Sequence, residues 1–151
     1  MSIIFEKSHF AEIQQHGEAA YPHECCGFLL GRLEAHRCIV RQTRRAQNQR
    51  VDSPQNRYQI SPQDYLQADR MARESGADII GFYHSHPDHP ARPSQFDLEN
   101  AAWPGLVYAI VAVKNGLAGE LTAWTLSEDR SRFIREEIIT PATSAVENFQ
   151  L

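Results

Sequence analysis

The segment from His84 to Asp97 constrains the fold more than any other part of the sequence. An apolar run, Ile79–Tyr83, leads directly into His84 and has the length of a buried strand. Prolines then stiffen a loop, and Ser94 begins an S-x-x-D motif of the kind found at helix N-termini. The sequence therefore predicts a buried strand, a stiff loop and a short helix in close succession.

His84 and His86 lie two residues apart at the end of the predicted strand, so their side chains point to the same face. Imidazole groups placed in this way can bind one zinc, copper or iron ion. Asp97, in the first turn of the predicted helix, can supply a third ligand, and a catalytic zinc takes three protein ligands and a water. We therefore predict an open zinc site formed by His84, His86 and Asp97.

Hydrolysis at such a site needs a base, because zinc lowers the pKa of its bound water and a nearby carboxylate takes the proton. We predict that Glu24, just before the strand that begins near Cys25, is this base. Nothing in the sequence by itself places Glu24 beside the histidines. Ser94 is predicted to donate a hydrogen bond to the oxyanion of a tetrahedral intermediate.

Outside this segment, strands and helices alternate along the chain. Strands are predicted at 2–5, 27–33, 38–43, 58–60, 106–113 and 121–126, helices at 8–20 and 62–75, and a short helix or strand at 131–137. Residues 44–57 are polar and basic and predict a loop that is long for a compact domain. With 151 residues, the chain suits a single domain, 1–140, followed by a loosely held tail, 141–151.

Charge and cysteine content narrow the function classes. The net charge is −4, whereas a nucleic-acid binder usually has a basic surplus. The first residues do not resemble a signal peptide, and no apolar stretch is long enough for a transmembrane helix. Cys25, Cys26 and Cys38 form no C-x-x-C pair and predict buried, reduced thiols. We therefore expect a cytoplasmic protein with neither a nucleic-acid nor a membrane partner.

The complete pattern resembles a known family. His84-x-His86, seven residues, Ser94, two residues and Asp97 resemble the signature of the JAMM metalloproteases, also called MPN-plus domains, and the upstream glutamate of that family matches Glu24. The resemblance covers nearly the whole chain. It implies an α/β (α+β) fold in which helices flank a curved mixed β-sheet, with a cytidine deaminase-like architecture. It also implies that the two histidines and the aspartate bind zinc, that Glu24 is the general base and that Ser94 aids the transition state.

The resemblance also implies a substrate class. JAMM proteases cleave peptide or isopeptide bonds, chiefly after the C-terminal glycine of ubiquitin-like proteins. This chain is similar to compact bacterial members that process ubiquitin-like sulfur-carrier proteins. Residues 24–27 and 84–93 resemble the corresponding segments of family members that remove a cysteine or a short C-terminal extension from such carriers. The implied partner is therefore a sulfur-carrier protein or its C-terminal conjugate, and the oligomeric state stays open.

Three other functions compete with this hypothesis. A non-catalytic MPN-minus scaffold is disfavoured, because such domains lose metal ligands and this chain keeps the full set. Zinc deaminases carry H-x-E followed by P-C-x-x-C, and this chain has neither motif. A metal-dependent hydrolase of a small molecule stays open. A narrow closed pocket would favour that hydrolase, whereas an open groove leading to the zinc would favour a peptide tail.

Several residues near these motifs have simpler interpretations. His89 more simply lines the proline-rich loop than binds the metal. Arg44, Arg45 and Arg50 are predicted to lie in a solvated loop, with contacts to a carboxylate of the substrate as the alternative. Trp103 is interpreted as a core or rim residue rather than a platform for substrate.

Overall fold

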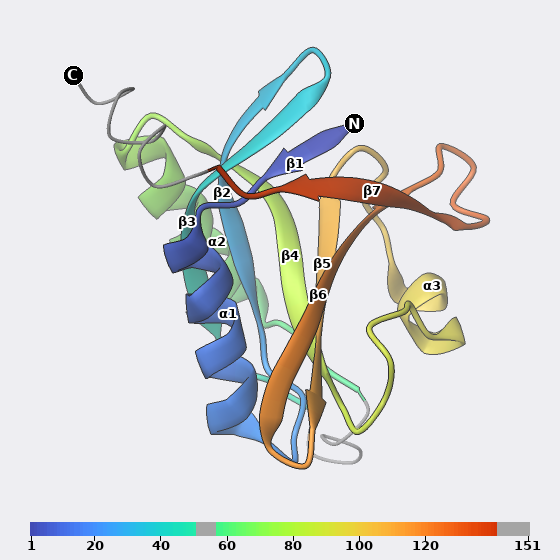
Figure 1. The fold of residues 1–151 in the computed structure, drawn as a ribbon. Helices are drawn as coiled ribbons and strands as arrows, with labels where there is room; N and C mark the ends of the chain where they lie inside the picture. The colour runs from blue at the N-terminus through green and yellow to red at the C-terminus, as the bar shows by residue number, and fades with distance from the viewer. Residues whose placement is uncertain (51–56, 142–151) are drawn as a thin grey trace.

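The structure of the protein is a computed structural model that describes residues 1–50 and 57–141. Helices and strands alternate along these residues, as the sequence predicts (Figure 1). In chain order the elements are β1 (Ser2–Ile4), α1 (Lys7–Ala20), β2 (Cys26–Glu34), β3 (Arg37–Ala46), α2 (Pro62–Glu74), β4 (Asp78–Pro87), α3 (Gln95–Asn100), β5 (Val107–Lys114), β6 (Leu117–Leu126) and β7 (Phe133–Ile139).

The seven strands form one mixed sheet in the order β1-β3-β2-β4-β5-β6-β7. β1 pairs in parallel with both β3 and β7, so the ladder of strands closes on itself. β4 lies between the antiparallel strand β2 and the parallel strand β5. The connection from β4 to β5 contains α3, in line with the crossover that parallel neighbours require. The predicted α+β class with a mixed sheet is confirmed.

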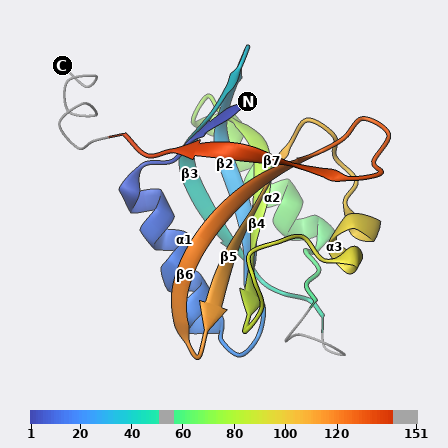
Figure 2. The same cartoon turned by 45° about the vertical axis from the view of Figure 1, so that its right-hand side comes forward.

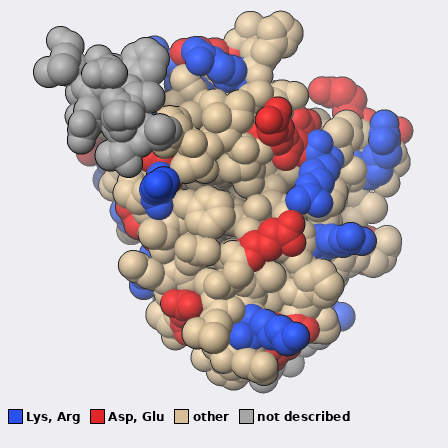
Figure 3. Space-filling model, viewed as in Figure 1, with Lys and Arg blue, Asp and Glu red and all other residues tan. Residues whose placement is uncertain are grey.

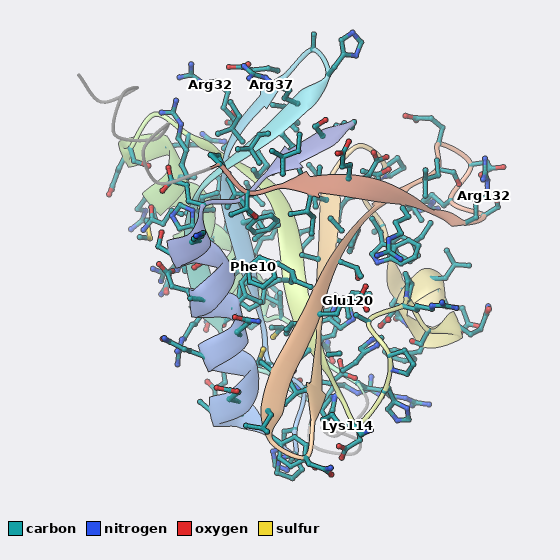
Figure 4. The ribbon with its side chains drawn as sticks, in the orientation of Figure 1. Phe10, Arg32, Arg37, Lys114, Glu120 and Arg132 are labelled. Atoms are coloured by element: carbon teal, nitrogen blue, oxygen red, sulfur yellow. The ribbon has the colours of Figure 1, made fainter. Side chains whose placement is uncertain are left out.

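α1 and α2 pack against different hydrophobic clusters on opposite faces of the sheet (Figures 1 and 2). Successive side chains of β2 point to opposite faces of the sheet. Leu29 therefore belongs to the cluster beneath α1, and Phe28 belongs to the cluster beneath α2. Phe10 points from α1 toward the strands (Figure 4). A Cβ at Gly17 of α1 would lie 2.9 Å from Val113 Cγ2, so glycine allows the helix to approach β5 closely.

α2 follows the prediction from its capping residues. The Ser61 side chain accepts a hydrogen bond of 3.1 Å from the Asp64 backbone N–H, and Pro62 opens the helix. Ser75 caps the other end, and Gly76 follows with a φ of 72°, a conformation that glycine adopts without strain. Residues 131–137, predicted as a helix or a strand, fall largely in a strand: 133–137 belong to β7, which pairs with β6, whereas 131 and 132 precede it.

Two predictions between β3 and α2 are wrong. Arg44 and Arg45 do not lie in a loop, because β3 continues to Ala46. These residues of β3 pair with the first residues of β2, whose backbone groups need hydrogen-bond partners. Residues 58–60 do not form a strand. The backbone of Gln59 instead bonds to Gln49 and to the Asn48 side chain. Residues 51–56 of the predicted loop lie outside the described residues, as does the predicted tail from 142 onward.

Charged side chains of both signs are mixed on the visible face of the protein (Figure 3). Arg37 and Glu34, for example, form an ion pair of 2.6 Å at the free end of the β2–β3 hairpin, where Figure 4 labels Arg32 and Arg37. Among the described residues, no helix is long and apolar enough to cross a bilayer.

Candidate metal centre

The three predicted ligands converge at the end of β4. His84 Nε2 lies 3.1 Å from His86 Nε2, and Asp97 Oδ2 lies 3.3 Å from the first atom and 3.1 Å from the second. A tetrahedral zinc with bonds of 2.0–2.1 Å would separate its ligand atoms by about 3.3 Å. The triangle therefore has the size that one zinc ion needs, and these nitrogen and oxygen donors suit it.

The surroundings of the two histidines orient their rings toward the triangle, and those of His84 favour the neutral imidazole that binds metals. His84 and His86 are 2% and 6% exposed. Burial lowers the pKa of His84. The Nδ1–H of His86 donates to the Pro90 carbonyl at 2.8 Å, which leaves the lone pair of Nε2 facing the triangle. The His84 ring stacks on Tyr58, with ring centroids 4.6 Å apart.

Asp97 is held in place by the first turn of α3. The Asp97 backbone N–H donates to Ser94 Oγ at 3.0 Å, and the Ser94 backbone N–H donates to Asp97 Oδ2 at 2.9 Å, which completes a capping box. Burial opposes ionisation of Asp97, but His84, His86 and the Ser94 N–H outweigh it and lower the pKa of Asp97. The capping box thus fixes an ionised carboxylate in the ligand triangle.

Pairing between β2 and β4 brings Glu24 to the same end of the sheet. Cys26 lies opposite His84 in the ladder. Beyond it, the Cys25 N–H donates to Ser85 Oγ at 2.8 Å, and the Ser85 N–H donates to the Cys25 carbonyl at 3.1 Å. Glu24 is the next residue, and it lines a cavity together with His86. The structure therefore brings all three ligands and the predicted base together.

Glu24 is a buried carboxyl group that forms no ion pair with any of the described residues. It is 4% exposed, and its Oε1 has no hydrogen-bond partner in the part of the chain that the structure describes. Burial, followed by the negative charge of Asp97, raises its pKa from 4.5 to about 9. A cation bound by the neighbouring ligands would lower that pKa, because opposite charge favours the carboxylate. The orphaned oxygen thus fits a site built around a metal ion.

Ser85 is a site residue that sequence reasoning missed. Its side chain points away from the ligand face, since it lies between His84 and His86 on the strand. It is fully buried and bonds to the backbone beside Glu24. The alternation of side chains along the strand could have indicated Ser85, because it places this serine on the buried face, where a polar side chain needs a hydrogen-bond partner.

Two cavities meet at the ligands. We call the larger one, of about 570 Å³, the aromatic cavity; it includes His84 and Asp97, and its aromatic walls are Tyr58, Tyr65, Phe82, Trp103, Tyr108 and Phe133 together with Phe96. We call the smaller one, of about 350 Å³, the cationic cavity; it is lined by Glu24, Arg57, His86, His89, Pro90, Arg92, Ser94 and Phe96. The ligand triangle and Phe96 therefore lie between two spaces.

The remaining predicted residues fall around these cavities. Trp103 lies at the rim, 49% exposed, and stacks on Tyr65 with ring centroids 6.2 Å apart. His89 lines the cationic cavity and is not one of the three converging ligands. Arg50 lines the aromatic cavity and lies over the Phe96 ring, 5.5 Å from its centroid.

The cysteines are buried thiols, as predicted. Burial raises the pKa of each, to about 11 for Cys25 and about 12 for Cys38. Thiols that stay protonated at neutral pH are poor nucleophiles and poor metal ligands. Cys25 and Cys26 therefore serve packing at the start of β2, beside the candidate metal centre.

Comparison with known proteins gives consistent results. Residues 6–127 match the family described as prokaryotic homologs of the JAB domain. A protein named desampylase from Haloferax volcanii is 34% identical over 118 residues, which are 77% of this chain and 80% of the relative. A protein named probable TtuB-protein conjugate cleaving protease, from Thermus thermophilus, is 31% identical over 101 residues, 66% of this chain and 64% of the relative.

A solved structure agrees with the fold. The JAB1/MPN domain protein AF2198 from Archaeoglobus fulgidus superimposes with a TM-score of 0.56 at 18% identity, covering 92% of this chain and 99% of that one. At this identity the likeness concerns the fold alone. The matched family spans both Glu24 and the three converging ligands. The chain therefore belongs to the prokaryotic JAB-domain family, and the predicted resemblance to compact JAMM proteins is confirmed.

Proposed function

We propose that this protein is a zinc-dependent peptidase or isopeptidase that cleaves after the C-terminal glycine of a ubiquitin-like protein of the sulfur-carrier type. The observation that carries the proposal is the buried triangle of His84, His86 and Asp97 with the carboxyl group of Glu24 beside it. The names of the relatives, a desampylase and a conjugate-cleaving protease, support protein conjugates as the substrate class.

Each residue of the site has a role in this reaction. Zinc, when bound, supplies Lewis-acid chemistry that activates water and polarises a carbonyl group. His84, His86 and Asp97 would hold it and leave one side open to the cavities. Glu24 takes a proton from the attacking water as the new C–O bond forms, and gives a proton to the amine nitrogen as the C–N bond breaks.

Ser94 has a positioning role and, we infer, a second role in catalysis. Its Oγ accepts the Asp97 N–H, which leaves the hydroxyl proton of Ser94 free to donate elsewhere. Ser94 is exposed and lines the cationic cavity together with Glu24. A hydroxyl in this position can donate to the oxyanion that forms at the scissile carbonyl.

The test offers several ubiquitin-like carriers with C-terminal extensions to the zinc-loaded protein and identifies the products by mass spectrometry. We expect cleavage directly after the terminal glycine, and loss of cleavage in Glu24→Gln while the zinc content stays the same. Glu128→Gln, at an exposed position, is the matched control and keeps full activity. Intact carriers after incubation with the zinc-loaded protein, or normal turnover by Glu24→Gln, would contradict the proposal.

A metal-dependent hydrolase of a small molecule is the second candidate, and the aromatic cavity is what favours it. A volume of about 570 Å³ is sufficient for a whole small ligand. The presence of a second cavity on the other side of the ligands favours a chain that runs through both. A cytoplasmic location, and the absence of nucleic-acid and membrane partners, stay predictions from the sequence.

A further inference from the structure

The two cavities divide the metal ligands between them. His84 and Asp97 line the aromatic cavity, His86 lines the cationic cavity, and Phe96 lines both. A bond held at the ligand triangle therefore has one cavity on each side. The arrangement leaves one question about specificity, namely which end of the substrate occupies which cavity.

The position of Glu24 answers this question. Of the two cavities, Glu24 lines the cationic one. A base that returns its proton to the leaving amine must lie within hydrogen-bond reach of that amine. On the proposed function, the leaving group therefore occupies the cationic cavity, and the tail that precedes the scissile bond occupies the aromatic cavity.

Two arginines, Arg57 and Arg92, line the cationic cavity. Guanidinium groups keep their charge at every physiological pH and match the geometry of a carboxylate. The guanidinium carbon of Arg57 lies 4.6 Å from the centroid of the Phe96 ring, which holds it at the wall. Within residues 1–50 and 57–141, no carboxylate forms an ion pair with either arginine.

The backbone at Arg92 is fixed relative to the metal centre. The Arg92 N–H donates to the Pro90 carbonyl at 2.8 Å, and the same carbonyl accepts the Nδ1–H of His86. The carbonyl of Ala91 accepts a hydrogen bond of 2.7 Å from the Thr122 hydroxyl of β6. The turn that carries Arg92 is therefore anchored to a ligand and to the sheet, as a recognition site requires.

We propose that Arg57 and Arg92 form a carboxylate-binding subsite for the leaving group. The protein would then prefer a bond followed by one or two residues with a free C-terminal carboxylate. A conjugate to a lysine side chain brings no negative charge to this cavity. Its volume of about 350 Å³ is at the small end of ligand pockets, which also suits a short leaving group.

The test measures binding of three peptides that share one tail. The first ends in Gly-Gly-Ala with a free carboxylate, and the second in the same sequence as a C-terminal amide. The third has Gly-Gly joined to the side chain of a lysine whose own carboxyl group is amidated. Binding is measured by calorimetry with chelator present, so that the carboxylate cannot bind a metal and no peptide is cleaved. We expect the carboxylate peptide to bind about ten-fold more tightly than the amide, the value of one charge-assisted hydrogen bond.

Variants assign the preference to the two arginines. In Arg57→Gln and Arg92→Gln the ratio of carboxylate to amide affinity is expected to fall toward one. Arg32→Gln removes the same charge from the distant β2–β3 hairpin (Figure 4) and keeps the ratio. Equal binding of the peptides, absence of binding by all three, or an unchanged ratio in both variants would overturn the subsite. A carboxylate preference without turnover by the zinc-loaded protein would refute the proposed hydrolysis alone.

Discussion

Glu24→Gln should change the stability of the metal-free protein in a way that depends on pH. Glu24 is buried, and its pKa is raised from 4.5 to about 9 in the folded chain. Between these values the folded chain keeps a proton that the unfolded chain has lost, so the free energy of unfolding falls as the pH rises. Glutamine has the same shape and does not ionise, so the variant is free of this effect.

The size of the effect follows from the two pKa values. Each pH unit between them lowers the stability of the wild-type protein, relative to the variant, by at most about 1.4 kcal/mol. Between about pH 5.5 and about pH 7.5 the ceiling is therefore about 3 kcal/mol. Relaxation and entry of water around a buried charge reduce such values, and we expect the variant to gain about 1–3 kcal/mol over this range.

Urea unfolding with chelator present, followed by tryptophan fluorescence, measures this difference at each pH. The stability of Glu24→Gln relative to that of the wild-type protein should rise steadily as the pH is raised from about 5.5 to about 7.5. Glu128→Gln, at an exposed position, should follow the wild-type protein throughout. Parallel curves for the wild-type protein and Glu24→Gln would refute the argument that the carboxyl group is buried and protonated without the metal.

Three further changes test other parts of the site. The wild-type protein, purified without chelator, should carry close to one zinc per chain by elemental analysis, and Asp97→Asn should carry far less, because the carboxylate ligand is lost. Gly27→Ala would place a Cβ against the Tyr83 ring, and we expect it to lower the free energy of unfolding, measured by thermal denaturation, by about 1–3 kcal/mol. The control Gly119→Ala should lower it much less, because the nearest atom to its Cβ is 3.9 Å away. Ser85→Ala leaves a buried backbone N–H without its acceptor; we expect slower turnover with unchanged zinc content, and normal kinetics would show that Ser85 does not position the base.

The metal ligands could be predicted from the sequence because the rules that place them are local. Alternation along a strand puts His84 and His86 on one face, and the S-x-x-D motif puts Asp97 in the first turn of a helix. The distance between these pieces is bridged by a short loop. The positions of the three ligands therefore follow mainly from local geometry, without contacts between distant parts of the chain.

Glu24 and the cavities depend on contacts between distant parts of the chain. Glu24 reaches the site through the pairing of β2 with β4, for which its own neighbours in sequence give no signal. The aromatic cavity collects side chains from residues as far apart as Tyr58 and Phe133, and no spacing connects them. Arg44 and Arg45 look like loop residues, but they belong to β3 because they pair with Phe28 and Gly27 of β2.

The closure of the sheet by β1 has a consequence for folding. Ser2 of β1 pairs with Glu137 of β7, so contacts of the first strand join the two ends of the described chain. Such pairing has a high contact order and forms slowly, because a long loop must close first. During synthesis on the ribosome β1 can pair with β3 early, but the ring stays open until β7 has emerged. Closure of the sheet is therefore a late step in the folding of the described residues.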